Sequence, residues 1–369
     1  MSDIKKSLVL LVFLLLAAGG QAFAQFPARI ASPVVDDDRR ATFSLEAPNA
    51  REVALNFQME THAMVRDAEG VWRVTIGPLD ADRYTYSFRV DGLKVLDPAN
   101  ALMQVGQYPD FSLVDVLADP PRFDQLQDVP HGDLHTLRYH SSAQDLDRKV
   151  AVYTPPGYDP CAGTDYPVLY LRHGGGGNET SWQVEGCALE ILDNLLARGD
   201  MVPMVVVMTN GNLEKPMDGG AYSKEGVAVM AAELMDDVMP LVEKKFRVST
   251  DPSRRAIAGL SMGGGQSFYM GLRHLEAFDW IGSFSSGIFG GIPGSTFDAE
   301  AQIPGILTRP GRFNEELQLL YLSVGEQDPR MEHTDQVVGQ FREAGLDLTY
   351  ETFRGTMNGR SGGTPSGVS

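Results

Sequence analysis

Histidine is scarce in this sequence, and none occurs near its C-terminal end. The chain has 369 residues and 7 histidines, of which the last is His333. Histidines that bind a metal commonly lie at short, regular spacings. Apart from His173, the histidines here are scattered, and we expect them to be surface or packing residues: His62, His131, His135, His140, His274 and His333. The sequence therefore predicts no metal site.

Cysteine and positive charge are also in short supply. The only cysteines are Cys161 and Cys187, which flank a predicted strand and its glycine-rich loop. The sequence leaves two alternatives for these cysteines, a disulfide bond or two free thiols. Lys and Arg number 31 against 49 Asp and Glu, which gives a formal net charge of −18. This excess of acid argues against a nucleic-acid partner and against membrane binding through a basic patch.

A long apolar run occurs only at the start of the chain. Lys5 and Lys6 precede an apolar stretch over residues 8–18, and Ala22-Phe23-Ala24 follows as a cleavage site of the small-x-small type. The stretch is shorter than the ~20 residues that a membrane-spanning helix needs. Residues 1–24 are therefore predicted to be a signal peptide, and the protein to be secreted or periplasmic and free of the membrane after cleavage.

Residues 28–117 have the pattern of an antiparallel β-sandwich. Apolar and polar residues alternate in short runs, which turn signals such as Pro48-Asn49 separate. The predicted strands are residues 41–47, 52–58, 71–76 and 84–90.

This N-terminal part also resembles the E-set, or immunoglobulin-like, modules that precede many carbohydrate-active enzymes. The resemblance rests on Gly70-Val71-Trp72, on the alternating run from Tyr84 to Val90 and on Asp97-Pro98. Trp72, Tyr84 and Tyr86 are candidates for stacking on sugars, and a place in the core or on a face of the sandwich is the simpler interpretation of each.

A proline- and acid-rich stretch, residues 118–133, is predicted to be a linker. Residues 134–355 then alternate between apolar strands and helical stretches, which is typical of a parallel sheet covered on both faces. The predicted strands are residues 134–141, 148–154, 167–172, 204–209, 254–258, 279–285, 319–324 and 348–353. The predicted helices are residues 187–198, 227–246, 264–275 and 334–344. Glycines 174–177 lack the lysine of a phosphate-binding loop, so no nucleotide cofactor is predicted.

The most informative motif is Gly259-Leu260-Ser261-Met262-Gly263, which reads Gly-x-Ser-x-Gly. A predicted strand precedes it, and a predicted helix follows from Gly264. A strand, a tight turn and a helix form the setting of a nucleophile elbow, in which the serine hydroxyl stands clear of the backbone. We therefore interpret Ser261 as a nucleophile.

A triad in such a setting continues with an acid and then a histidine. Asp328 follows a predicted strand and is the candidate acid, and Glu326 is a weaker candidate. A histidine is expected after the last predicted strand, residues 348–353, but the sequence has none there. His333 precedes that strand, and we interpret it as a surface residue at the start of a helix. The general base is therefore missing.

Residues 134–355 resemble the esterase D-type α/β-hydrolases, the group of feruloyl, acetylxylan and enterochelin esterases. The nucleophile motif of that group is matched by Gly259–Gly264, and its strand and oxyanion loop by Tyr166–Gly177. Phe246-Arg247-Val248, followed by Arg254–Gly259, is similar to the usual approach to the elbow. The resemblance implies an α/β-hydrolase fold, here preceded by a small all-β immunoglobulin-like sandwich.

The resemblance also implies that Ser261 is the nucleophile and Asp328 the triad acid. Attack by the serine creates an oxyanion, which needs preorganised donors. One predicted donor is the backbone N–H of Met262, and the other comes from the glycine loop, at Gly174 or Gly175.

Residues 356–369 depart from the pattern of the group. A Gly-x-His-x-Trp motif and a terminal helix are implied after the last strand, but the chain reads Thr356-Met357-Asn358-Gly359 and then a Gly/Ser-rich tail. One base inserted after the Thr356 codon makes the Met357 and Asn358 codons read His-Glu and permits a Trp next. We hypothesise that the C-terminus is truncated or frameshifted before the triad histidine, which leaves an aberrant, disordered tail.

Three functions remain open. The first is a secreted serine carboxylic-ester hydrolase that removes feruloyl or acetyl groups from plant polysaccharide and is impaired here by the missing histidine. The second is an enterochelin-type siderophore esterase. The third is a non-catalytic carbohydrate-binding protein. The expected partner is an acylated polysaccharide or oligosaccharide, with no cofactor.

Overall fold

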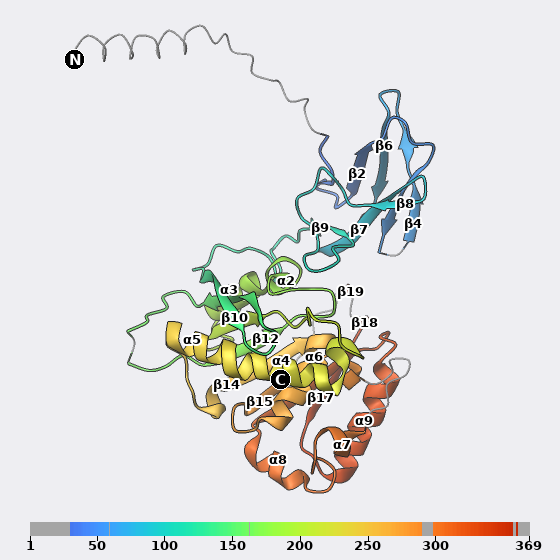
Figure 1. Ribbon diagram of the computed structural model, residues 1–369. Helices are drawn as coiled ribbons and strands as arrows, with labels where there is room; N and C mark the ends of the chain where they lie inside the picture. Colours follow the sequence, from blue (N-terminus) through green and yellow to red (C-terminus); the bar gives the residue numbers. More distant parts are fainter. Residues whose placement is uncertain (1–29, 59, 162, 290–297, 357–358, 361–369) are drawn as a thin grey trace, which may run out of the picture.

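The computed structural model describes residues 30–356 and 359–360, apart from positions 59, 162 and 290–297. The predicted signal peptide lies outside these residues. Figure 1 shows a β-rich part in blue, followed by an α/β part coloured from green to red. In the described part of the chain, no helix is both long enough and apolar enough to cross a membrane.

The blue part contains two antiparallel sheets, as the alternating pattern predicts. One sheet has the strand order β1 (Val34–Val35), β2 (Ala41–Glu46), β6 (Val71–Ile76) and β5 (Val65–Arg66). The other has the order β4 (Glu60–Ala63), β3 (Val53–Phe57), β7 (Asp82–Val90) and β8 (Leu93–Val95), with β9 (Ser112–Val116) also paired to β7. The four predicted strands correspond to β2, β3, β6 and β7.

The core between these sheets contains two of the three aromatic residues that were candidates for sugar stacking, and the third, Tyr84, is partly buried against it. Trp72 is buried, and its Nε1 donates to the carbonyl oxygen of Ala47 at 3.0 Å. Tyr86 is fully buried beside Phe43 and donates to Asp97 at 2.8 Å. Their side chains are therefore structural, and sugar stacking is wrong for both.

The α/β part is built on one eight-stranded sheet, which matches all eight predicted strands. Its order is β10 (Asp133–Ser141), β11 (Leu146–Thr154), β13 (Val205–Thr209), β12 (Val168–Arg172), β14 (Arg255–Leu260), β15 (Trp280–Phe284), β16 (Leu319–Gly325) and β17 (Thr349–Phe353). The pairs β10–β11 and β11–β13 are antiparallel, and all later pairs are parallel. Parallel strands bring their carboxyl ends to one edge, where the candidate functional residues gather.

Helices connect the parallel strands. They are α2 (Ser181–Val184), α3 (Ala188–Arg198), α4 (Lys224–Ala232), α5 (Met239–Lys245), α6 (Met262–Arg273), α7 (Ala299–Gln302), α8 (Pro310–Glu316) and α9 (Met331–Ala344), with 3₁₀ turns at η1 (Gly220–Tyr222), η3 (Pro252–Arg254) and η4 (Gly287–Phe289). The π-helical segment η2 (Glu233–Val238) joins α4 to α5. It precedes Pro240, whose missing N–H and bulky ring do not fit a regular α-helix, so the wider π turn accommodates the proline.

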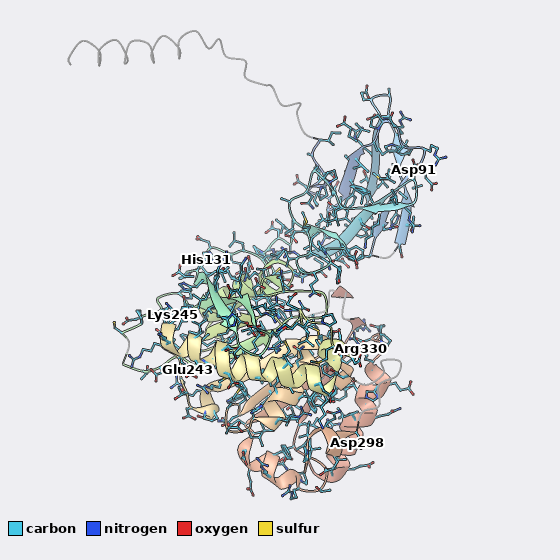
Figure 2. All side chains as sticks on the ribbon, in the orientation of Figure 1. Asp91, His131, Glu243, Lys245, Asp298 and Arg330 are labelled. Carbon is cyan, nitrogen blue, oxygen red and sulfur yellow. The ribbon has the colours of Figure 1, made fainter. Side chains whose placement is uncertain are left out.

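The stretch predicted to be a linker, residues 118–133, contains no helix or strand before Asp133, where β10 begins, but it is held in place. The side-chain amide of Asn194 in α3 donates to the carbonyl oxygen of Phe123 at 2.8 Å. Nδ1 of His131, labelled in Figure 2, lies 2.9 Å from a carboxylate oxygen of Asp193. The stretch therefore packs along α3 rather than running free between the two parts.

The sandwich contacts the α/β part at the glycine loop after β12. The N–H of Gln107 donates to the carbonyl oxygen of Gly176 at 2.9 Å, and that of Val105 donates to the Glu185 carboxylate at 3.3 Å. A Cβ on Gly106 would lie 2.0 Å from the same Gly176 oxygen, so only glycine permits this approach. Burial at this contact raises the pKa of Glu185.

Two further expectations concern the cysteines and the C-terminal residues. Cys161 is exposed, Cys187 is buried, and no disulfide bond joins these two described residues. After β17, Gly355–Thr356 and Gly359–Arg360 form the short antiparallel pair β18–β19, so a disordered tail from Thr356 is wrong for these residues. Residues 361–369 lie outside the described part of the chain.

Because the sandwich has its own aromatic core, residues 28–117 are expected to fold when expressed as a fragment. The expected result is a β-type far-ultraviolet circular dichroism spectrum with a cooperative thermal transition. Phe43→Ala, which empties the centre of that core, is the matched control and is expected to cost roughly 3–5 kcal/mol. A fragment that is unfolded by the same measurement contradicts a separate domain.

Candidate active site

Ser261 lies at a sharp turn between β14 and α6. It has a φ of 53° and a ψ of −115°. Residues other than glycine rarely adopt this backbone conformation, which costs about 1–3 kcal/mol. Its N–H donates to the carbonyl oxygen of Phe284, at the end of the neighbouring strand β15, at 2.8 Å. The turn is thus held from the adjacent strand, as a nucleophile elbow requires.

The two glycines of the motif stand where no side chain fits. A Cβ on Gly259 would lie 2.4 Å from the carbonyl carbon of Gly263. A Cβ on Gly263 would lie 2.5 Å from the carbonyl oxygens of Arg172 and His173. The start of α6 therefore packs directly on the end of β12, and this close packing explains why the motif needs glycine at both positions.

The glycine loop after β12 passes beside the serine. A Cβ on Gly174 would lie 3.6 Å from Cβ of Ser261, which is van der Waals distance. A Cβ on Gly175 would lie 2.4 Å from the hydroxyl oxygen of Tyr222, so this tyrosine covers the loop. The predicted oxyanion donors thus belong to two segments that flank Ser261: this loop, and the first turn of α6 with Met262.

His173 holds the glycine loop in place by hydrogen bonds to the backbone. It is buried, its Nδ1 donates to the carbonyl oxygen of Gly174 at 2.6 Å, and its Nε2 accepts from the N–H of Gly211 at 2.9 Å. One nitrogen donates and the other accepts, so the imidazole is neutral here. Burial is the main cause that lowers the pKa of His173 to about 4.

Asp328 lies in the turn after β16, and its side chain is fully buried. Both carboxylate oxygens accept from the side chain of Arg330, Oδ1 from Nε at 2.8 Å and Oδ2 from Nη2 at 3.0 Å. The weaker candidate acid, Glu326, is exposed. Of the two acids, Asp328 is therefore the one placed to act within the site.

Arg330 also reaches the serine. Its Nη1 donates to Oγ of Ser261 at 3.1 Å, so a single guanidinium connects the candidate nucleophile to the candidate acid. The position of Arg330 on the α/β part is marked in Figure 2. His333 lies in the first turn of α9, as predicted, where it is half-buried and burial lowers its pKa.

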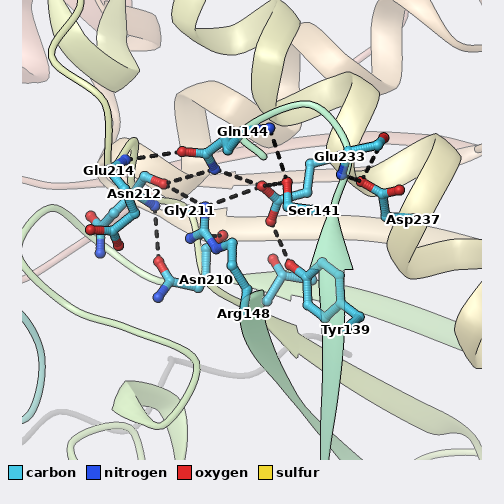
Figure 3. A network of polar contacts seen from close by, with 12 residues as sticks. Tyr139, Ser141, Gln144, Arg148, Asn210, Gly211, Asn212, Glu214, Glu233 and Asp237 are labelled. Atoms are coloured by element: carbon cyan, nitrogen blue, oxygen red, sulfur yellow. Dashed lines mark hydrogen bonds and ion pairs between the residues drawn. The ribbon is translucent and has the colours of Figure 1, made fainter. Parts of the chain in front are cut away.

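A buried polar network joins β10, β11 and η2 to residues 210–212 (Figure 3). Its centre is the carboxylate of Glu233 in η2, which accepts from Tyr139, Ser141, Gln144 and Arg148. The Arg148 and Glu233 side chains are 3% and 4% exposed, so the pair is compensated by hydrogen bonds rather than by water.

This network continues into the site through residues 210–212. Arg148 donates to the carbonyl oxygens of Asn210 and Asn212 at 3.2 and 2.8 Å. The side-chain amide of Asn212 donates in turn to the carbonyl oxygen of Gly177 at 2.6 Å. The ion pair therefore supports the backbone that contacts His173 and the glycine loop.

Comparison with known proteins places the chain in a family. A family described as "Putative esterase" matches residues 141–342, more than half of the chain. The chain belongs to this esterase family. The membership that the elbow and loop motifs led us to expect is therefore confirmed at the level of the family.

Two relatives of this chain carry names that concern xylan. An endo-1,4-beta-xylanase/feruloyl esterase of Xylanibacter ruminicola is 33% identical over 265 residues, which cover 70% of this chain and 36% of that protein. Endo-1,4-beta-xylanase Y of Acetivibrio thermocellus is 31% identical over 140 residues, which cover 35% of this chain and 12% of that protein. The esterase thus spans about a third of the first protein and less of the second.

Solved structures show that the fold is the α/β-hydrolase fold. The enterobactin esterase of Shigella flexneri matches with a TM-score of 0.64 at 18% identity, covering 86% of this chain and 88% of that one. The ferulic acid esterase of Anaeromyces mucronatus matches with a TM-score of 0.54 at 21% identity, covering 69% of this chain and 91% of that one. The predicted fold class is confirmed.

Two side chains of the esterase site were not identified from the sequence. His173 lies within the recognised loop motif, but nothing in the sequence indicated that its two ring nitrogens would form hydrogen bonds with Gly174 and Gly211. Arg330 lies only two residues after Asp328, and its contact with Ser261 depends on how β14 and β16 bring their ends together.

Acid is expected to destabilise the esterase through His173. Unfolded, this histidine takes up a proton near its ordinary pKa of 6.5, whereas in the fold its pKa is about 4. Between these values the unfolded chain binds more protons, so the free energy of unfolding falls as the pH falls from 6.5 towards 4, by about 3 kcal/mol for this one group.

The matched control for this prediction is His173→Gln, since glutamine is neutral but keeps a donor and an acceptor. Urea unfolding at several pH values measures both proteins. The expected result is a smaller loss of stability with acid in the glutamine variant. Equal slopes between pH 6.5 and 4 contradict a buried neutral histidine.

Proposed function

We propose that this protein is a secreted serine esterase that removes feruloyl or acetyl groups from plant polysaccharide. The observation that carries the proposal is Ser261, held in a strained elbow beside Gly174 of the glycine loop. The relatives named for xylanase and feruloyl esterase activity support the substrate class. The predicted signal peptide supports secretion or export to the periplasm.

In the proposed reaction, Oγ of Ser261 attacks the ester carbonyl and forms an acyl-enzyme, which water then hydrolyses. The N–H of Met262 and one from Gly174 or Gly175 stabilise the oxyanion. Asp328 is the triad acid. The group between acid and serine is the Arg330 guanidinium, and a guanidinium cannot accept the serine proton, so slow turnover is expected.

Two alternative functions have observations in their favour. An enterochelin-type esterase is favoured by the Shigella flexneri structure, because that likeness extends over 86% of the chain. A non-catalytic carbohydrate-binding protein is favoured by the arginine that stands where a triad has its base. Binding of xylan without turnover of any ester supports this last alternative.

The test is to assay the purified protein on three substrates, a ferulate ester, acetylxylan and a ferric-catecholate ester, each beside Ser261→Ala. The expected result is slow hydrolysis of a ferulate or acetyl ester that is lost in the Ser261→Ala variant. Preference for the catecholate ester points to the siderophore esterase instead. Hydrolysis that survives in Ser261→Ala contradicts the assigned nucleophile.

A further inference from the structure

The Arg330 guanidinium spans the same gap that an imidazole spans in a serine triad. In a triad, one imidazole nitrogen donates to the acid and the other accepts the proton of the serine. Here Nε and Nη2 of Arg330 donate to Asp328 at 2.8 and 3.0 Å, and Nη1 donates to Ser261 Oγ at 3.1 Å. The arginine makes both connections, but with donors at each end.

The aliphatic stem of Arg330 is packed against a neighbouring segment of backbone. A Cβ on Gly287, which has a φ of 58°, would lie 3.1–3.2 Å from the Cβ, Cγ and Cδ atoms of Arg330, so the arginine stem lies against that backbone. Its side chain is 19% exposed. The charge also acts on Tyr222, whose pKa is raised by burial and lowered in part by Arg330. The fold thus provides an enclosed space between Asp328 and Ser261 that a planar cationic group fills.

We propose that Arg330 occupies the position of the general base, and that a neutral imidazole binds there and activates Ser261 once the guanidinium is removed. The proposal rests on the proposed function of Ser261. An alanine at position 330 leaves more space than an imidazole ring occupies, and Asp328 remains to orient the ring. Arg330 is then a positioning residue: it fills the place of the base and holds Ser261 Oγ by a hydrogen bond, but it cannot accept the serine proton.

The chemistry of the rescued reaction balances without any further reagent. The unprotonated nitrogen of imidazole takes the hydroxyl proton as Ser261 Oγ bonds to the ester carbonyl carbon. The imidazolium returns that proton to the leaving alkoxide as the carbon–oxygen bond breaks. Water repeats the cycle with the same imidazole and releases the acid.

The experiment compares p-nitrophenyl acetate hydrolysis by the full chain and by Arg330→Ala over a range of imidazole concentrations. Imidazole attacks this ester by itself, so the double variant Ser261→Ala/Arg330→Ala supplies the background. Arg330→Gln is the matched control, because it removes the charge but still fills most of the space. Arg330→Ser serves in place of Arg330→Ala if the latter does not fold.

The expected result is a saturable acceleration of Arg330→Ala by imidazole, on the order of 10²-fold above the background, and little effect on the unchanged chain or on Arg330→Gln. The rate follows the unprotonated fraction of imidazole, so it rises with pH through the pKa of imidazole itself. Equal acceleration of the unchanged chain and Arg330→Ala overturns the proposal.

Binding is measured separately, by the shift of the imidazole ¹⁵N resonances on addition of protein. Arg330→Ala is expected to bind imidazole, and Asp328→Asn/Arg330→Ala to bind it at least tenfold more weakly, on the scale of one lost charge-assisted hydrogen bond. Binding without rescue means that the site exists and that Ser261 is not the nucleophile, which is a failure of the proposed function alone. Absence of binding in folded Arg330→Ala overturns the inference about Arg330.

Discussion

A histidine placed after β17 is expected to raise the rate of p-nitrophenyl acetate hydrolysis by several orders of magnitude. The change is to replace the residues that follow Thr356 with His-Glu-Trp and the sequence that the restored reading frame specifies. Loss of a triad histidine typically costs on the order of 10⁴- to 10⁶-fold in rate, and restoring it should recover much of that factor. The histidine is expected to displace the Arg330 guanidinium from Ser261.

The control for this experiment is the same frame-restored protein with the new histidine changed to alanine, which separates the base from the effect of the added residues. The rates are measured as kcat/KM under identical conditions. Comparable rates for the unchanged and frame-restored proteins contradict both the missing-base argument and the frameshift hypothesis. A rate in the unchanged chain that disappears in His333→Ala shows instead that His333 supplies the base.

The second large effect is expected in the buried network of Figure 3. Glu233→Ala leaves Arg148 as a buried charge without its carboxylate partner, and removing one member of such a pair costs roughly 3–5 kcal/mol. The same change also removes the acceptor of Tyr139, Ser141 and Gln144. Urea unfolding, followed by circular dichroism, measures the loss.

Glu233→Gln is the matched control, because it keeps the shape and one acceptor oxygen but not the charge. It is expected to be destabilised less than Glu233→Ala. Since Arg148 supports Asn210 and Asn212, the alanine variant is also expected to loosen the glycine loop and to lower kcat more than it raises KM. A loss of stability below about 1 kcal/mol contradicts a network that depends on Glu233.

The eight strands of the main sheet could be predicted from the sequence because local signals agree with the fold. Runs such as residues 205–208 are apolar at every position, as expected for a strand covered on both faces. The Gly-x-Ser-x-Gly motif located the elbow. Its two glycines are required because they pack on one another and on the end of β12. In the β-rich part, the strands β1, β4, β5, β8 and β9 were missed. They have two to five residues each, which carry too little pattern.

The parts of the site that depend on several distant segments could not be predicted. The contact of Arg330 with Ser261 joins residues 69 positions apart in the sequence. The contact of Arg148 with Glu233 joins residues 85 positions apart. Neither pair leaves a local signal, because hydrogen bonds between strands and helices are set by the order of strands in the sheet. For the same reason, the docking of Gln107 on the glycine loop was not visible in the sequence.

The central claim is that Ser261 forms the acyl-enzyme. The most direct measurement is to incubate the frame-restored protein with p-nitrophenyl acetate, stop the reaction in acid and locate the acetyl group by peptide mass spectrometry. The account predicts one acetyl group, on the peptide that contains Ser261, and none on that peptide in Ser261→Ala. Turnover with the acetyl group on another residue contradicts the account. Turnover that is unchanged in the Ser261→Ala variant contradicts it as well.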